Sequence, residues 1–241
     1  MKQMFFEKIN GKKIFAILTE PENPQKKIVI MCHGFRGSSL GPSRIFVDFE
    51  RLLLKNGFSV LRFDQPNSGN SEGDFLNTSF DEWTKTTVYF AKKFLDNNYK
   101  VTLLGQSMGG ACVVIASASE ELKDKIQCLL LWVPDPKSTF NNVVDAVYEE
   151  NGQKYKGTFW QEVKEADFFG CLEKYKGAIH LVYGEEDKFI TKDLREQVMA
   201  KVGEKGQPFI ILPGQDHSPW AFDSCQKVYR EELDFLRRCF G

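Results

Sequence analysis

The sequence predicts an α/β fold, in which a mostly parallel β-sheet is covered by helices on both faces. Short apolar, β-branched runs alternate with segments whose apolar residues recur at helical spacing, a pattern typical of strands joined by crossover helices. The run Ile28–Cys32 is apolar throughout, and Ile126–Val133 is apolar apart from Gln127, as expected of strands buried on both faces. At 241 residues the chain can pack around one core, so we expect a single domain over residues 1–241.

The first part of the chain predicts four strands and two helices. The turn pair Asn10-Gly11 predicts a hairpin between the first two strands. Ser79 followed three residues later by Glu82 has the form of a capping box and predicts the start of a helix. The predicted strands are Met4–Lys8, Ile14–Leu18, Ile28–Cys32 and Phe58–Phe63, and the predicted helices run from Pro42 to about Asn56 and from Ser79 to about Leu95.

The second part continues the alternation and ends in a helix. Its predicted strands are Val101–Leu104, Ile126–Val133, Ala178–Tyr183 and Pro208–Leu212. A helix rich in small residues follows the first of these strands and reaches about Ala118. The closing helix, from about Ala221 to Cys239, is amphipathic, with its apolar stripe expected to face the core.

One segment, residues 134–176, lacks this rhythm and is rich in aromatic residues. An irregular insertion of that length in a compact domain is usually functional, so we interpret it as a short lid of helices over the site. For most of its aromatic side chains, fastening the insertion to the body is the simpler role. The aromatic residues are Phe140, Tyr148, Tyr155, Phe159, Trp160, Phe168 and Phe169.

Composition excludes several classes of function. The net charge of −1 and the absence of a Lys/Arg run disfavour nucleic acid as a partner. No stretch is apolar enough to span a membrane, and the N-terminus does not resemble a signal peptide. No metal-ligand spacing or dinucleotide-binding loop is present, so no metal or cofactor is expected. The scattered cysteines predict reduced thiols and a cytoplasmic location: Cys32, Cys112, Cys128, Cys171, Cys225 and Cys239.

The segment GQSMG, residues 105–109, has the form of a nucleophile elbow. The GxSxG pattern alone is common, but here it follows an apolar strand and precedes a helix. A turn that sharp strains the backbone at Ser107 and tolerates only small residues two positions away. The serine would then project above the sheet edge at the positive end of the following helix, where developing negative charge is stabilised. Ser107 is therefore the candidate nucleophile.

The chain resembles the α/β-hydrolase family, and within it the compact cinnamoyl (feruloyl) esterases and monoacylglycerol lipases. Four segments carry the resemblance along nearly the whole chain: HGF at 33–35, the elbow, GEED at 184–187 and DH at 216–217. It implies an eight-stranded sheet whose second strand is antiparallel, and catalysis by Ser, Asp and His in that chain order. One departure is the turn at 67–73, which lacks the histidine that relatives often carry there.

Only three histidines compete for the role of general base. His33 belongs to the HGF turn, where the resemblance gives it a structural role, and His180 lies inside an apolar strand. His217 follows the last strand, where the family places its base, and imidazole titrates near neutrality. His217 is therefore the predicted base.

The acid that orients this histidine is predicted to be Asp187. The residue matches the family's acid in the register of GEEDKFIT, ahead of its neighbours Glu185 and Glu186. Asp135, directly after a strand, is the alternative, because some family members carry the acid there. Asp64 and Asp216 are expected to serve as hydrogen-bonding or solvent-facing residues.

Acyl transfer also needs two donors for the oxyanion. We expect the backbone N–H of Met108, directly after the nucleophile, and, from the HGF resemblance, that of Phe35. Phe35 could equally form only a wall of the pocket.

These residues predict an enzyme that hydrolyses small-molecule carboxylic esters of small to medium acyl or aryl groups through an acyl-enzyme. A thioesterase, peptidase or perhydrolase would use the same residues, whereas a dehalogenase or epoxide hydrolase would need Asp at position 107. A non-catalytic receptor on the same fold is the alternative from another class. Oligomeric state is not readable from the sequence.

Overall fold

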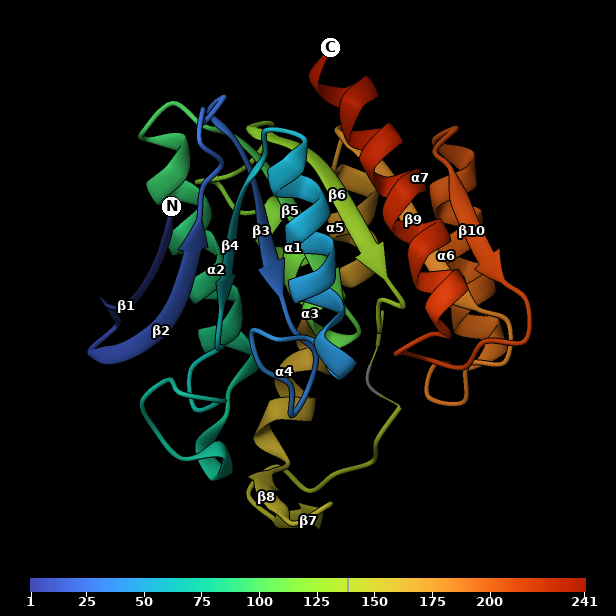
Figure 1. Ribbon diagram of the computed structural model, residues 1–241. Helices are drawn as coiled ribbons and strands as arrows, with labels where there is room; N and C mark the ends of the chain where they lie inside the picture. The colour runs from blue at the N-terminus through green and yellow to red at the C-terminus, as the bar shows by residue number, and fades with distance from the viewer. Residues whose placement is uncertain (138) are drawn as a thin grey trace.

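The computed structural model describes residues 1–137 and 139–241 and contains the predicted eight-stranded sheet (Figure 1). The strands lie in the order β1-β2-β4-β3-β5-β6-β9-β10. β2 pairs antiparallel with both β1 and β4, and the remaining pairs are parallel. The strands are β1 Lys2–Ile9, β2 Lys12–Thr19, β3 Lys27–Cys32, β4 Ser59–Phe63, β5 Lys100–Gln106, β6 Ile126–Trp132, β9 Ala178–Gly184 and β10 Phe209–Leu212.

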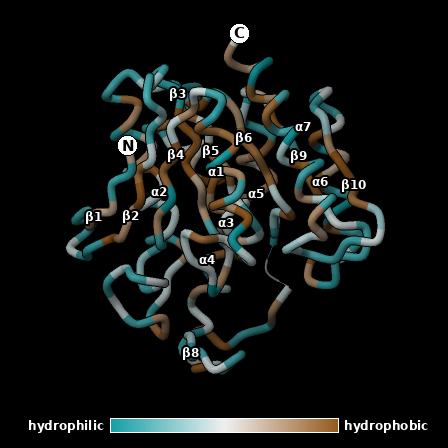
Figure 2. Tube along the Cα trace, viewed as in Figure 1, coloured by the Kyte–Doolittle hydropathy of each residue, from teal (hydrophilic) through white to brown (hydrophobic). Residues whose placement is uncertain are grey.

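Helices cover both faces of this sheet, as Figure 1 shows. α1 (Ile45–Lys55) and α7 (Phe222–Phe240) pack side by side on one face, whereas α2 (Phe80–Leu95), α3 (Met108–Ser117), α5 (Phe168–Lys174) and α6 (Lys192–Glu204) lie on the other. The central strands are therefore mostly apolar and buried along most of their length, which Figure 2 shows as a hydrophobic centre within a more hydrophilic shell. Among the described residues, no helix has the length and hydrophobicity that crossing a bilayer requires.

The structure differs from the prediction at three helix positions. α1 begins at Ile45 rather than Pro42, because Ser43 and Arg44 both have positive φ values. α6 was not predicted, since its apolar stripe is short and only Val198 and Val202 among its apolar residues are fully buried. α2 starts at the predicted N-cap, Ser79, and the third difference concerns the partner that completes its cap.

The capping box predicted for α2 is half formed. The Ser79 hydroxyl accepts the Glu82 N–H, but the Glu82 carboxylate turns away and binds Lys12. Its place is taken by Glu162, which accepts hydrogen bonds from the Ser79 hydroxyl at 2.9 Å and the Phe80 N–H at 2.6 Å. Because a carboxylate is stabilised at a helix N-terminus, Glu162 fastens the inserted segment to the body.

The insertion between β6 and β9 contains a hairpin as well as helices. β7 (Val147–Glu150) pairs antiparallel with β8 (Gln153–Lys156), and α4 (Thr158–Glu165) follows. In Figure 1 the hairpin lies beyond the end of the sheet toward which the parallel strands point. Ligands of open α/β sheets bind at this carboxyl end, so the insertion stands over the expected position of the site.

Candidate active site

Ser107 occupies a strained turn between β5 and α3, as the elbow motif predicts. Its φ of 56° and ψ of −123° are rare for a residue with a side chain. The Ser107 N–H donates to the Trp132 carbonyl at 2.8 Å, which ties the turn to β6. A Cβ atom on Gly109 would lie 2.2 Å from the carbonyl oxygen of Cys32, so glycine is required there and the helix can start close against β3.

His217 reaches Ser107 from the loop between β10 and α7. Its Nε2 lies 2.8 Å from the Ser107 Oγ. The loop is held at two points: the Trp220 indole donates to the His217 carbonyl at 3.0 Å, and the His217 N–H donates to the Asp216 carboxylate at 2.7 Å. Asp216 thus serves as a hydrogen-bonding residue, as predicted.

Asp187 completes a continuous set of hydrogen bonds. Its Oδ2 lies 2.8 Å from His217 Nδ1, and its Oδ1 accepts the N–H groups of Phe189 and Ile190 at 2.9 Å each. The carboxylate side chain is fully buried. With Nδ1–H donating to Asp187, Nε2 is free to accept the serine proton, so the set can convert the Ser107 hydroxyl into a nucleophile.

Asp135, the alternative acid, lies close to this set but is not part of it. Its N–H donates to the Ser107 carbonyl at 3.2 Å, and its carboxylate accepts the Lys137 N–H at 3.3 Å. Burial raises the pKa of the Asp135 carboxyl to about 7, and the charge of Asp187 also raises it, while the Lys137 N–H and the charge of His217 lower it. The geometry at His217 Nδ1 favours Asp187 as the orienting acid.

The other two histidines are engaged elsewhere. His33 is buried, and its two ring nitrogens bond the Gln65 N–H at 2.9 Å and the Gly34 carbonyl at 2.8 Å. Burial lowers the pKa of His33, which favours a neutral, structural imidazole. His180 is also buried and lies 3.1 Å from a Glu232 carboxylate oxygen. Neither contributes to the set around Ser107.

The loop after β3 brings the backbone of Gly34 against Ser107. A Cβ atom on Gly34 would lie 2.9 Å from the Ser107 Cβ, so only glycine permits this approach. Asp64 fixes the same loop farther along by accepting the Ser39 N–H at 2.6 Å. Met108 is the first residue of α3, and its N–H therefore has no acceptor within the helix.

The Phe35 ring is enclosed by aromatic side chains, three of which come from the insertion. Ring centroids of Phe159, Trp160 and Tyr155 lie 4.7, 4.8 and 5.1 Å from that of Phe35, and Phe75 lies 5.2 Å away. The three insertion residues are almost fully buried. They fasten the insertion to the loop after β3, which is the simpler of the two roles that the sequence suggested.

Ser107, His217 and Phe35 line one cleft of about 580 Å³, a size suited to a small ligand. The lining also includes residues that were not predicted, among them Arg36 and, from the hairpin, Gln153. The Arg36 guanidinium lies 3.0 Å from Glu150 at the end of β7, so an ion pair holds the hairpin at the cleft. No pattern in the sequence marks these residues, because the fold alone brings the hairpin here.

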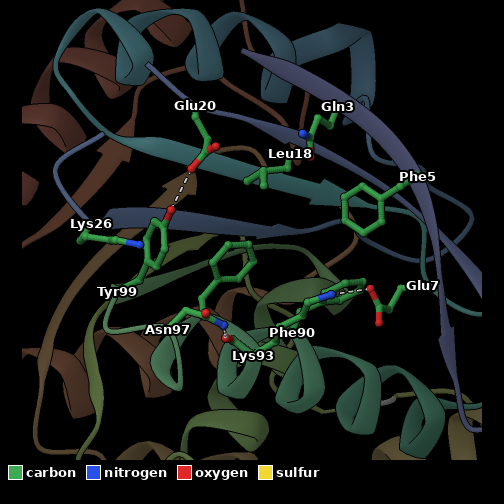
Figure 3. A pocket seen from close by; sticks show the side chains of 11 residues that line it. Gln3, Phe5, Glu7, Leu18, Glu20, Lys26, Phe90, Lys93, Asn97 and Tyr99 are labelled. Atoms are coloured by element: carbon green, nitrogen blue, oxygen red, sulfur yellow. Dashed lines mark hydrogen bonds and ion pairs between the residues drawn. The ribbon is translucent and has the colours of Figure 1, made fainter. Parts of the chain in front are cut away.

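A second hollow, of about 410 Å³, lies between the N-terminal hairpin and α2 (Figure 3). Polar side chains within it interact with one another: Lys93 forms an ion pair with Glu7, and the Tyr99 hydroxyl donates to Glu20 at 2.7 Å. Burial and the bond to Glu20 raise the pKa of Tyr99 to about 12. This second hollow contains none of the predicted site residues. Among the described residues, no cluster of His, Cys, Asp or Glu could hold a metal ion.

The comparisons with known proteins bear on the family and the fold of this chain. The family described as alpha/beta hydrolase fold matches residues 27–148. A Mycoplasma genitalium protein provisionally named esterase/lipase 2 is 28% identical over 145 residues, which is 58% of this chain; the match spans about half (51%) of that protein's length.

Solved structures that share the fold include the following two. Est1E from Butyrivibrio proteoclasticus with ferulic acid bound has a TM-score of 0.84 at 24% identity and covers 99% of both chains. The monoacylglycerol lipase of Paleococcus ferrophilus has a TM-score of 0.73 at 17% identity, over 93% of this chain and 99% of its own.

Proposed function

This chain belongs to the α/β-hydrolase fold family, and on that basis we propose that it is a serine hydrolase that cleaves carboxylic esters of small to medium acyl or aryl groups. The observation that carries the proposal is the unbroken set of hydrogen bonds from Ser107 through His217 to Asp187, with 2.8 Å at each step. Ser107 is the proposed nucleophile, His217 the general base and Asp187 the acid that orients it.

In the proposed reaction, the Ser107 oxygen attacks the ester carbonyl while His217 Nε2 takes the hydroxyl proton. The oxyanion receives hydrogen bonds from the N–H groups of Met108 and Phe35. His217 then gives the proton to the leaving alcohol, which leaves an acyl-enzyme on Ser107. Water, activated by the same imidazole, releases the acid and restores the serine.

We further propose that residues 134–176 act as a lid within a single domain. The Glu162 bonds to the start of α2 and the Arg36–Glu150 ion pair support this role. Because the buried insertion aromatics surround Phe35, the lid sets the position of the loop that carries one oxyanion donor. The cleft volume of about 580 Å³ supports a substrate of small to medium size.

The proposal is tested by the turnover of p-nitrophenyl esters of graded acyl length, with methyl ferulate as an aryl substrate. A thioester and an anilide of the preferred acyl group separate an esterase from a thioesterase or a peptidase. We expect hydrolysis of the esters, and its loss in Ser107→Ala with an unchanged unfolding midpoint. Full turnover by the folded alanine variant, or no turnover of any substrate by the wild type, would contradict the proposal.

A further inference from the structure

The side chain of Gln106 joins two loops that approach the nucleophile from opposite ends of the sequence. Gln106 is the last residue of β5, directly before Ser107, and is only 5% exposed. Its Oε1 accepts the Gly34 N–H at 3.1 Å, and its Nε2 donates to the Ser218 Oγ at 2.8 Å. One amide therefore spans the loop after β3 and the loop after β10.

The orientation of this amide is fixed by its first partner. A backbone N–H can only donate, so the Gln106 oxygen must face Gly34 and the NH₂ group must face Ser218. The Ser218 oxygen is then the acceptor in this bond. The Gln106 side chain therefore acts as an acceptor toward the loop after β3 and as a donor toward the loop after β10.

Both partners lie next to residues of the proposed machinery. Gly34 precedes Phe35, the proposed oxyanion donor, and Ser218 follows the proposed base His217. We infer that Gln106 is a positioning residue, which holds the oxyanion loop and the histidine loop at a fixed separation across Ser107. This inference rests on the proposed function. In this role Gln106 positions groups that stabilise the transition state and does not itself bind the substrate.

The role predicts which kinetic constant changes. A displacement of about 1 Å at a reacting group can cost roughly 100-fold in rate. Both Gln106 bonds hold loops that carry groups proposed to stabilise the transition state, so their loss should have an effect of this kind. Interactions made only in the transition state affect kcat and leave KM nearly unchanged. Loss of the amide should therefore reduce kcat without a matching increase in KM.

The test compares Gln106→Met, which keeps the length of the side chain but removes both bonds, with Ser218→Ala, which removes one. Gln127→Met is the matched control, because Gln127 is a strand glutamine whose amide donates to the Cys239 carbonyl at 2.7 Å, at the opposite end of its strand from the cleft. kcat is expressed per site titrated with a fluorophosphonate, which removes any effect of an inactive, unfolded fraction.

We expect Gln106→Met to lower kcat by about 10- to 100-fold with KM within about twofold of wild type. Ser218→Ala should lower kcat less, and should have no further effect when added to Gln106→Met, because the two changes remove the same bond. Gln127→Met should leave kcat per site unchanged.

The inference is overturned if Gln106→Met keeps kcat per site within about threefold of wild type, or if its loss appears in KM alone. If Ser218→Ala lowers kcat further in the Gln106→Met background, the hydrogen bond between Gln106 and Ser218 does not explain the loss. These outcomes differ from failure of the proposed function, in which the wild type itself turns over no substrate or Ser107→Ala remains active.

Discussion

Substitution of Asp187 by Asn tests which carboxylate orients the histidine. The Asp187 Oδ1 accepts two backbone N–H groups, from Phe189 and Ile190, and Oδ2 pairs with His217 Nδ1. An asparagine can keep its oxygen toward the two N–H groups and must then present its NH₂ group to the imidazole. Because NH₂ donates, His217 Nδ1 becomes the acceptor and the proton moves to Nε2. In that tautomer Nε2 cannot accept the proton of Ser107.

The size of the loss follows from this change of tautomer. The two backbone bonds survive, so we expect little change in the free energy of unfolding. The equivalent substitution in a serine protease lowers kcat by about 10⁴-fold, which corresponds to about 5.5 kcal/mol of transition-state stabilisation. We expect a decrease of the same order in kcat on a p-nitrophenyl ester.

The assay measures kcat and KM of Asp187→Asn beside Asp135→Asn, with the unfolding midpoint of each variant. Asp135 is the matched control, because it is a second carboxyl close to Ser107 whose backbone N–H bonds the Ser107 carbonyl. We expect a far smaller loss of kcat in Asp135→Asn. If Asp187→Asn keeps more than a tenth of the wild-type kcat, or if Asp135→Asn causes the larger loss, the assignment of the acid is wrong.

Three further predictions concern stability. Burial raises the pKa of Asp135 to about 7, so the folded chain retains a proton that the unfolded chain loses near pH 4. The free energy of unfolding of the wild type should therefore fall between pH 4 and 8 by up to about 4 kcal/mol, and by less where cleft water solvates the carboxylate. Urea unfolding of Asp135→Asn, followed over the same pH range, should lack this decrease. Glu162→Gln weakens the hydrogen bonds to the Ser79 hydroxyl and the Phe80 N–H, so it should lower the free energy of unfolding in urea by about 1–2 kcal/mol. An unfolding midpoint equal to that of wild type would contradict the view that Glu162 anchors the insertion to α2. Gly109→Ala would place a Cβ atom 2.2 Å from the Cys32 carbonyl oxygen, so we expect loss of the folded protein, and normal thermal unfolding would contradict the close approach.

The sequence predicts the sheet and its strands because the buried runs are continuous and apolar. It identifies Ser107 because local geometry demands the glycines of the elbow. It identifies His217 because only three histidines compete and the family resemblance places the base after the last strand. The signal for Ser107 is local. The strain at Ser107, with φ of 56°, is the structural counterpart of that pattern.

Features that depend on distant partners were not predictable. Glu162 lies 83 residues from Ser79 in the sequence, yet its carboxylate caps α2 in place of Glu82. The bond between Gln106 and Ser218 spans 112 residues. These two hydrogen bonds are set by the packed fold and not by spacing along the chain. The sequence does not indicate α6 for another reason: its buried apolar stripe is too short to give a clear helical period.

The most direct test of the central claim is covalent labelling with a fluorophosphonate, followed by mass spectrometry of the digested protein. We expect one adduct per chain, on the peptide that contains Ser107, with labelling abolished in Ser107→Ala and strongly slowed in His217→Ala. A wild-type chain that resists the probe, or an alanine variant at position 107 that is labelled as fast as wild type, would contradict the account.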